Sequence, residues 1–161
     1  MIKTMHGRVI KHGTYIPVSS EPFDMPLSLN LELLHSNTLL CVYMISADKT
    51  VDFTYNANTD IPILTRTDRR LKIEDIYYLI RSRVFPDNPA VAPYELMRLG
   101  LSEYNPYEII EITHGIMPTD SYWLRRGGED IDFEAALHLF YNPIKPDSGR
   151  YSGGGIDDFL S

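Results

Sequence analysis

The distribution of apolar and polar residues divides the chain into a strand-forming part and a helix-forming part. Apolar and polar positions alternate along residues 28–34 and 50–55, which predicts two half-buried strands. Between them, residues 39–45 are apolar on both faces and predict a central strand. Turn-forming residues separate the three segments, so we expect an antiparallel meander, preceded by a short strand pair at 8–11 and 14–18.

After Pro62 the apolar residues recur at the spacing of amphipathic helices. Pro86 is expected to end the first helix, and Gly100 to cap the end of the second. Asp120 or its neighbour Thr119 is expected to cap a short turn through Trp123. The expected helices span 73–84, 93–99, 106–114 and 133–141, the last of them capped by Asp132.

These patterns predict an α+β fold: an N-terminal antiparallel β-meander followed by a cluster of short α-helices and a flexible C-terminal tail. We expect a single α+β domain over residues 1–142, mainly β over 1–65 and mainly α over 72–142. Residues 143–161 are acidic and rich in Gly, Pro and Ser, and we expect them to form the flexible tail.

Charge is distributed unevenly along the 161 residues, whose net charge is -7. Residues 1–72 carry eight Lys and Arg against seven Asp and Glu, a net of +1, whereas residues 73–161 carry seven against fifteen, a net of -8. An acidic half disfavours wrapping a nucleic-acid backbone. It suits a protein partner with a basic surface, or it serves solubility alone.

The sequence contains no motif that marks an enzyme, a metal site or a nucleotide-binding site. Its five histidines are scattered singly, its glycines match neither a P-loop nor a dinucleotide-binding fingerprint, and GxSxG does not occur. The one cysteine, Cys41, lies in an apolar run and is expected to be buried and inert. We therefore expect a protein that is not an enzyme, with no catalytic residue, cofactor or metal.

The sequence also gives no sign of a membrane segment. No apolar run approaches the ~20 residues that a membrane helix needs, and the N-terminus lacks the pattern of a secretory signal. Together with the single cysteine, this predicts a cytoplasmic protein with no membrane partner.

Two segments are candidates for binding a protein. One is the tip of the tail, where apolar anchors flank negative charge after a glycine-rich stretch, as in a docking peptide; an ordinary disordered terminus is the equal alternative. The other is an acidic run that a glycosidase-type carboxylate pair would also fit, although a solvated loop with a helix cap is favoured. The protein-binding residues predicted are Ile156, Asp157, Asp158, Phe159 and Leu160 in the tail and Glu129 and Asp130 in the run.

A basic cluster supplies the alternative site. Arg66, Arg69, Arg70 and Lys72 form the strongest electropositive patch of the sequence, and they could bind a phosphate backbone or an acidic partner. A solvated loop before a helix is the favoured interpretation, so nucleic acid is the less favoured partner.

Several short motifs between residues 80 and 142 resemble a pattern in small uncharacterised proteins of Firmicutes mobile elements. The pattern comprises Phe85-Pro86, Leu99-Gly100-Leu101, Tyr104-Asn105-Pro106, Glu108-Ile109-Ile110, Thr113-His114-Gly115-Ile116-Met117 and Asp120-Ser121-Tyr122-Trp123. The stretch around Trp123, with residues 132–142, is also similar to the region that precedes the kinase domain in some HipA-like proteins. The catalytic elements of such a kinase are missing here.

The resemblance implies a protein-interaction or regulatory module of a bacterial mobile element. Proteins of this size on such elements include acidic, non-enzymatic inhibitors such as anti-CRISPR proteins, which present negative charge to the basic nucleic-acid channel of an RNA-guided nuclease. The alternative is a HipA-type toxin–antitoxin regulatory module, or a nucleic-acid-binding regulator that uses the basic patch from Arg66 to Lys72. A small hydrolase built on residues 129–134 is a third, remote hypothesis.

Deletion of residues 153–161 is expected to weaken capture of the partner while leaving the melting temperature unchanged, because a tethered peptide adds effective concentration and no packing. Pull-downs from the native host and thermal melts of both forms measure the two effects. A large fall in the melting temperature would show that these residues are packed and are not a tail.

Overall fold

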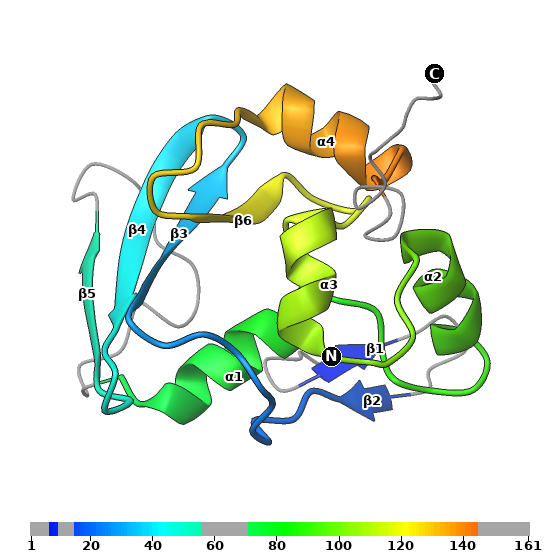
Figure 1. Cartoon of the computed structure of the whole chain (residues 1–161), viewed down its shortest axis with the longest axis horizontal. Helices are drawn as coiled ribbons and strands as arrows, with labels where there is room; N and C mark the ends of the chain where they lie inside the picture. Colours follow the sequence, from blue (N-terminus) through cyan, green and yellow to red (C-terminus); the bar gives the residue numbers. More distant parts are fainter. Residues whose placement is uncertain (1–6, 10–14, 56–70, 145–161) are drawn as a thin grey trace, which may run out of the picture.

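The strands expected from the alternation form two antiparallel sheets (Figure 1). A two-stranded sheet pairs β1 (Gly7–Val9) with β2 (Tyr15–Pro17), close to the expected positions. The larger sheet has four strands in the order β5-β4-β3-β6, so the apolar strand β4 is interior as expected. Its members are β3 (Leu29–His35), β4 (Thr38–Ile45), β5 (Val51–Tyr55) and β6 (Tyr122–Arg126).

This computed structural model describes residues 7–9, 15–55 and 71–144. The predicted tail from residue 145 onward therefore lies outside the described residues, and so does most of the basic cluster.

Four helices lie where the apolar spacing predicted them, and the last begins on the expected cap, Asp132. The Asn105 side chain accepts hydrogen bonds from the backbone nitrogens of Tyr107 (2.8 Å) and Glu108 (3.2 Å). Asp132 accepts one from the backbone nitrogen of Ala135 (2.9 Å). The helices are α1 (Ile73–Ser82), α2 (Ala92–Leu99), α3 (Pro106–Thr113) and α4 (Phe133–Tyr141). With the antiparallel sheets, they confirm the α+β fold class.

The segment Tyr122–Arg126 is a strand, so the prediction of a short capped turn through Trp123 is wrong. The strand pairs antiparallel with β3, and Leu124 lies opposite Leu33. Trp123 and Leu124 are both buried but belong to different core clusters, as expected where successive side chains point to opposite faces of a sheet. Local turn signals could not reveal this, because the pairing partner lies far earlier in the sequence.

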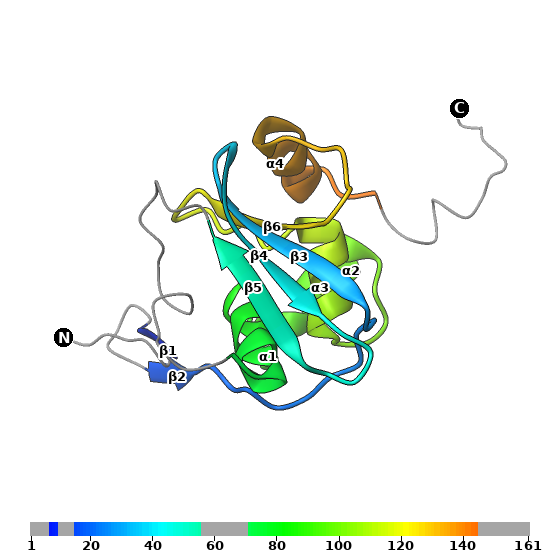
Figure 2. The same ribbon diagram turned by 90° about the vertical axis from the view of Figure 1, so that its left-hand side faces the viewer.

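Two apolar clusters pack against the four-stranded sheet. The larger cluster joins residues of β3, β4 and β5 to α1 and α3, and Figure 2 shows these two helices behind the sheet. The smaller cluster packs Trp123 and Leu34 against Ala136 of α4. The Trp123 side chain is fully buried, and its indole nitrogen donates a hydrogen bond to the carbonyl of Ser36 (2.6 Å). The carbonyl of Ser36 thus supplies the acceptor that a buried indole nitrogen needs.

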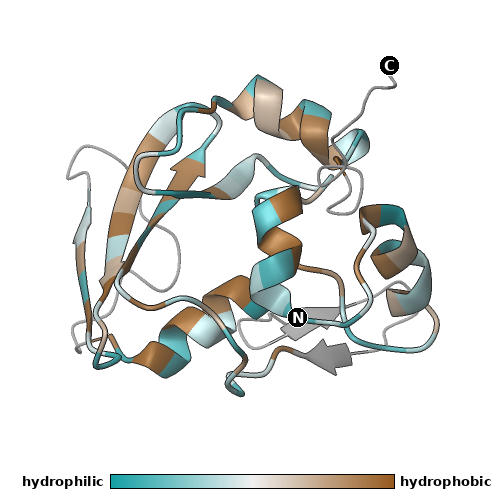
Figure 3. Cartoon of the chain, in the orientation of Figure 1, coloured by the Kyte–Doolittle hydropathy of each residue, from teal (hydrophilic) through white to brown (hydrophobic). Residues whose placement is uncertain are grey.

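Apolar positions recur along β3, β4, α1 and α3 (Figure 3). Cys41 of β4 is 1 % exposed, which confirms its predicted burial. Burial raises the pKa of the thiol, and this shift disfavours the reactive thiolate. Among the described residues, no helix has both the length and the apolar character that a membrane span requires.

Arg83, the residue that ends α1, connects this helix to the segment that leads from α3 into β6. Its side chain is 11 % exposed, and it donates hydrogen bonds to the carbonyls of Gly115 (2.9 Å) and Tyr122 (2.7 Å). Its two terminal nitrogens also donate to the Asp120 carboxylate, at 3.0 and 2.8 Å. The planar guanidinium suits such a set of acceptors, so one side chain fixes the start of β6 relative to α1.

Stability should depend on the ionisation of Asp120. Burial alone raises the pKa of this carboxyl, but the hydrogen bonds and positive charge of Arg83 outweigh it, so the pKa lies below its ordinary value. A lowered pKa in the folded state stabilises the fold above the unfolded-state pKa, and this contribution is lost as the pH falls through the folded-state pKa. We expect Asp120→Asn to lower the free energy of unfolding by about 1 kcal/mol at neutral pH.

Urea unfolding of both proteins, repeated at decreasing pH, measures this effect. The difference between them should begin to shrink below about pH 4, where the carboxyl of the unfolded chain becomes protonated, and should disappear as the pH falls through the lower pKa of the folded state. Asp130→Asn, at an exposed position with no ion pair among the described residues, is the matched control and should change stability little at any pH. A difference that persists unchanged into acid would contradict the role given to the Asp120 carboxylate.

Candidate protein-binding surface

Four of the five arginines of the helical half, residues 71–144, are engaged by the protein itself, whereas Arg126 is exposed and forms no ion pair among the described residues. Arg125 lies opposite Glu32 on the neighbouring strand and donates to its carboxylate (2.6 Å), as Arg83 does to Asp120. Arg98 pairs with Glu95 one turn earlier in α2 (3.1 Å). Backbone carbonyls accept further hydrogen bonds from these residues and from Arg81; they are those of Gly115, Tyr122, Phe140, Ile131 and Glu21.

The exterior of the same half carries many carboxylates without such partners. Residues 71–144 contain twelve Asp and Glu against six Lys and Arg, a net of -6. Eight exposed acidic residues form no ion pair with any basic residue in the described part of the chain: Glu74, Asp87, Glu103, Glu108, Glu111, Asp130, Asp132 and Glu134. The exposed Lys and Arg residues of this half are Lys72 and Arg126, so its outer surface is predominantly negative.

Helix α2 is short and is fixed at both ends by local hydrogen bonds. Before it, the Asn88 side chain accepts from the backbone nitrogens of Ala90 (2.9 Å) and Val91 (3.0 Å). At its end, Gly100 has a φ of 75°, which a residue with a side chain rarely adopts. There the nitrogen of Leu101 donates to the carbonyl of Leu96, and that of Gly100 to Met97, the pattern of a Schellman motif.

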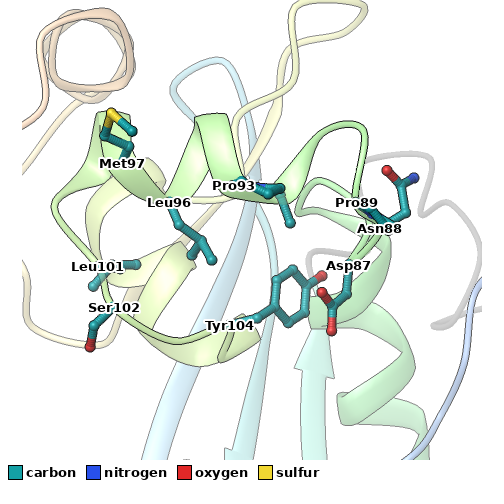
Figure 4. Close-up of a pocket in the computed structure, with 10 residues that line it drawn as sticks. Asp87, Asn88, Pro89, Pro93, Leu96, Met97, Leu101, Ser102 and Tyr104 are labelled. Carbon is teal, nitrogen blue, oxygen red and sulfur yellow. The ribbon is translucent and has the colours of Figure 1, made fainter.

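An open groove of about 780 Å³ lies along α2 (Figure 4). Leu96 and Leu101, brought together by the helix end, form an apolar part of its wall with Pro93. Asp87 and Ser102, from the segments before and after the helix, also line it. The complete lining is Asp87, Asn88, Pro89, Ala92, Pro93, Leu96, Met97, Leu101, Ser102 and Tyr104.

Tyr104 forms a fixed part of the groove. Its hydroxyl donates a hydrogen bond to the carbonyl of Phe85 (2.6 Å), and the two rings meet edge to face with centroids 5.7 Å apart. Two large side chains on α2 stand out from the surface beside it: Met97 is 71 % exposed and Tyr94 is 74 % exposed. Exposed tyrosine and methionine are typical anchors of protein interfaces.

A second polar cluster lies between α3 and the turn after β6. His114 is buried, and its Nε2 lies 2.9 Å from an oxygen of Glu129, whose other oxygen accepts from the backbone nitrogen of Arg126 (3.1 Å). Burial raises the pKa of the nearby Tyr107 hydroxyl to about 12, and the negative charge of Glu111 acts in the same direction. The cavity beside these residues has about 20 Å³, room for about one water molecule and for no substrate.

The predicted site residues fall into three groups: those outside the described residues, those exposed on the surface, and one that is half-buried. The five tail residues 156–160 and the arginines at 66, 69 and 70 lie outside the described residues. Lys72 is exposed, and its backbone nitrogen donates to the Asp75 side chain (2.8 Å) at the start of α1. Asp130 is exposed, whereas Glu129 is half-buried and turned towards His114. The structure thus separates the two acidic residues that the sequence grouped together.

Neither a metal site among the described residues nor a known relative helps to identify the ligand of this surface. No group of three or more His, Cys, Asp or Glu within the described ranges could hold a metal ion. Comparison with protein-family models, with curated proteins and with solved structures found no match. The resemblance to mobile-element and HipA-like proteins therefore stays a prediction.

The groove was not among the predicted sites, although one signal in the sequence pointed to it. Leu96 and Leu99 are three positions apart and share a helix face, whereas Met97 lies about 100° from the first and 200° from the second. Helical geometry therefore leaves Met97 unable to enter the same core as Leu99. A large apolar residue off the buried face of a short helix is the observation that could have indicated a binding surface.

Glu129 and Asp130 should respond differently to truncation. Glu129→Ala removes the acceptor that faces the buried His114 ring, so we expect it to lower the free energy of unfolding by about 1–3 kcal/mol. Asp130→Ala, at the adjacent exposed position, should change it by less than about 0.5 kcal/mol. Chemical denaturation of the two variants measures both values. Equal and negligible effects would show that the contact between Glu129 and His114 contributes nothing to the fold.

Proposed function

We propose that this chain is a non-enzymatic protein-interaction module whose helical half binds a partner with a basic surface. The proposal rests on one observation: four of the five arginines of this half are engaged in internal contacts, while eight of its exposed carboxylates form no ion pair among the described residues. Such a surface attracts a positively charged partner over a distance and repels nucleic acid and acidic proteins.

The local chemistry supports binding over catalysis. The buried cluster that contains His114 and Glu129 has titratable groups in contact, but its cavity is too small for a substrate. The large hollow, beside α2, is open and lacks a nucleophile paired with a base among the residues that line it. An open groove with apolar walls and exposed anchors is suited to a protein segment.

The partner class follows from the charge and from the resemblance to mobile-element proteins. An acidic surface on a small domain can occupy the basic channel that a nucleic-acid-processing enzyme uses for its phosphate backbone. We therefore assign the chain as an inhibitor of a host defence enzyme of this kind, comparable to an anti-CRISPR protein. RNA-guided nucleases are the enzymes on which this assignment is most directly tested.

The test measures the concentration of the chain that halves DNA cleavage by each member of a panel of RNA-guided nucleases from Gram-positive bacteria. We expect inhibition of at least one nuclease. Neutralising three acidic residues of the helical half, in the variant Glu103→Gln, Glu108→Gln and Glu111→Gln, should weaken that inhibition about tenfold, because the three charges face a basic channel.

A second triple variant with the same change in charge provides the control. Glu21→Gln, Asp24→Asn and Asp52→Asn neutralise exposed acidic residues that precede the helices. This control should weaken inhibition by no more than about twofold. Absence of inhibition across the panel, or equal weakening by both triple variants, would refute the assignment. Salt-dependent binding of the chain itself to RNA or DNA would instead favour the nucleic-acid-binding alternative.

A further inference from the structure

The geometry of the groove along α2 points to its ligand: an amphipathic helix of the partner whose apolar face is flanked by Lys or Arg. This inference rests on the proposed function as a binding module and names the chemistry that the site recognises. It is independent of which enzyme the partner is.

The apolar anchors would come from the middle of the ligand helix. Pro93, Leu96 and Leu101 form an apolar stretch of the wall, and the exposed Met97 continues it along α2. Tyr94, three positions before Met97, extends the same exposed apolar surface. Burying these side chains against leucine or phenylalanine of a ligand would remove apolar area from water at about 25 cal/mol per Å². The unbranched methionine adapts to the shape of such anchors.

The backbone of the ligand must satisfy its own hydrogen bonds. Every described residue that lines the groove belongs to α2 or to the segments directly before and after it, between Asp87 and Tyr104. None of the strands that the structure describes lines the groove, and the edges of the larger sheet are β5 and β6. An extended peptide would therefore find no ladder of backbone partners here, whereas a helix forms its own hydrogen bonds.

The charges at the ends of the groove select basic flanks. Asp87 lines it before α2, and the exposed Glu103 directly follows the lining residue Ser102 after α2. Among the described residues, no basic side chain lines the groove. The nearest arginine on the helix, Arg98, is engaged by Glu95 and by the carbonyl of Phe140. Lys or Arg on either side of the apolar anchors would therefore meet unpaired carboxylates.

The groove is also preorganised for binding. The Schellman motif at Gly100, the Asn88 side chain and the hydrogen bond from Tyr104 to Phe85 hold its two ends and one wall in place. A rigid site loses little conformational entropy when its ligand binds. The ordering cost falls mainly on the ligand, which suits a segment that is already helical in the partner.

The test is a selection of random peptides of about 16 residues, displayed on phage, against the full chain. We expect the enriched sequences to carry apolar residues three and four positions apart, flanked by Lys or Arg. Fluorescence polarisation of the best peptide should then show about tenfold weaker binding to Met97→Asp. The pair Asp87→Asn and Glu103→Gln should weaken binding about threefold at low salt and less at high salt.

The matched control is Tyr141→Asp, which makes the same substitution at an exposed large side chain on α4, outside the groove. It should leave the affinity within about twofold. Thermal melts establish that each variant is folded, as expected for positions that are exposed. Failure to enrich peptides, enrichment of acidic or non-periodic sequences, or binding that survives Met97→Asp would each overturn the inference. The selection contains no nuclease, so these failures differ from a failure of the proposed inhibition, which the cleavage assay detects by itself.

Discussion

The structure depends on ion pairs and hydrogen bonds that its arginines form inside the fold. Arg83 joins the end of α1 to the segment entering β6, and Arg125 joins β6 to β3 through Glu32. Without these contacts, the edge strand would be held to the rest of the sheet by backbone pairing and packing alone. Arginine suits this task because its planar guanidinium serves several acceptors at once. These internal contacts also have an electrostatic consequence. An arginine that is paired within the fold does not neutralise the carboxylates on the surface.

The interior and the exterior of the molecule therefore differ in character. In the interior, Arg83 and Arg125 are paired with carboxylates, and Trp123, α1, α3 and α4 pack into the apolar clusters on the sheet. Outside, the helical half presents carboxylates and, along α2, a groove with exposed Met97 and Tyr94. Negative charge accelerates encounter with a basic partner, and apolar anchors provide most of the affinity after contact. A short helix fixed at both ends places these anchors without a mobile loop.

Features written in local sequence could be predicted, and features that depend on distant contacts could not. Asp132 and Gly100 mark helix ends through hydrogen bonds or backbone angles within a few residues, and both act as expected. The strand β6 escaped prediction because its pairing with β3 joins the two ends of the domain. Glu129 was grouped with Asp130 because both are acidic neighbours, whereas only the folded chain brings Glu129 to His114. The groove along α2 arises from the segments before and after the helix, so composition alone did not indicate it.

The most direct measurement of the central claim is hydrogen–deuterium exchange of the chain, free and bound to a nuclease that it inhibits. Binding is expected to slow exchange in residues 87–111, which include the groove, the acidic positions Glu103 and Glu108, and most of α3, because a bound partner excludes water from this surface. Exchange in the turn between β4 and β5 should stay unchanged. Slower exchange confined to the basic segment 66–72, with none in 87–111, would contradict the claim that the acidic helical half is the recognition surface.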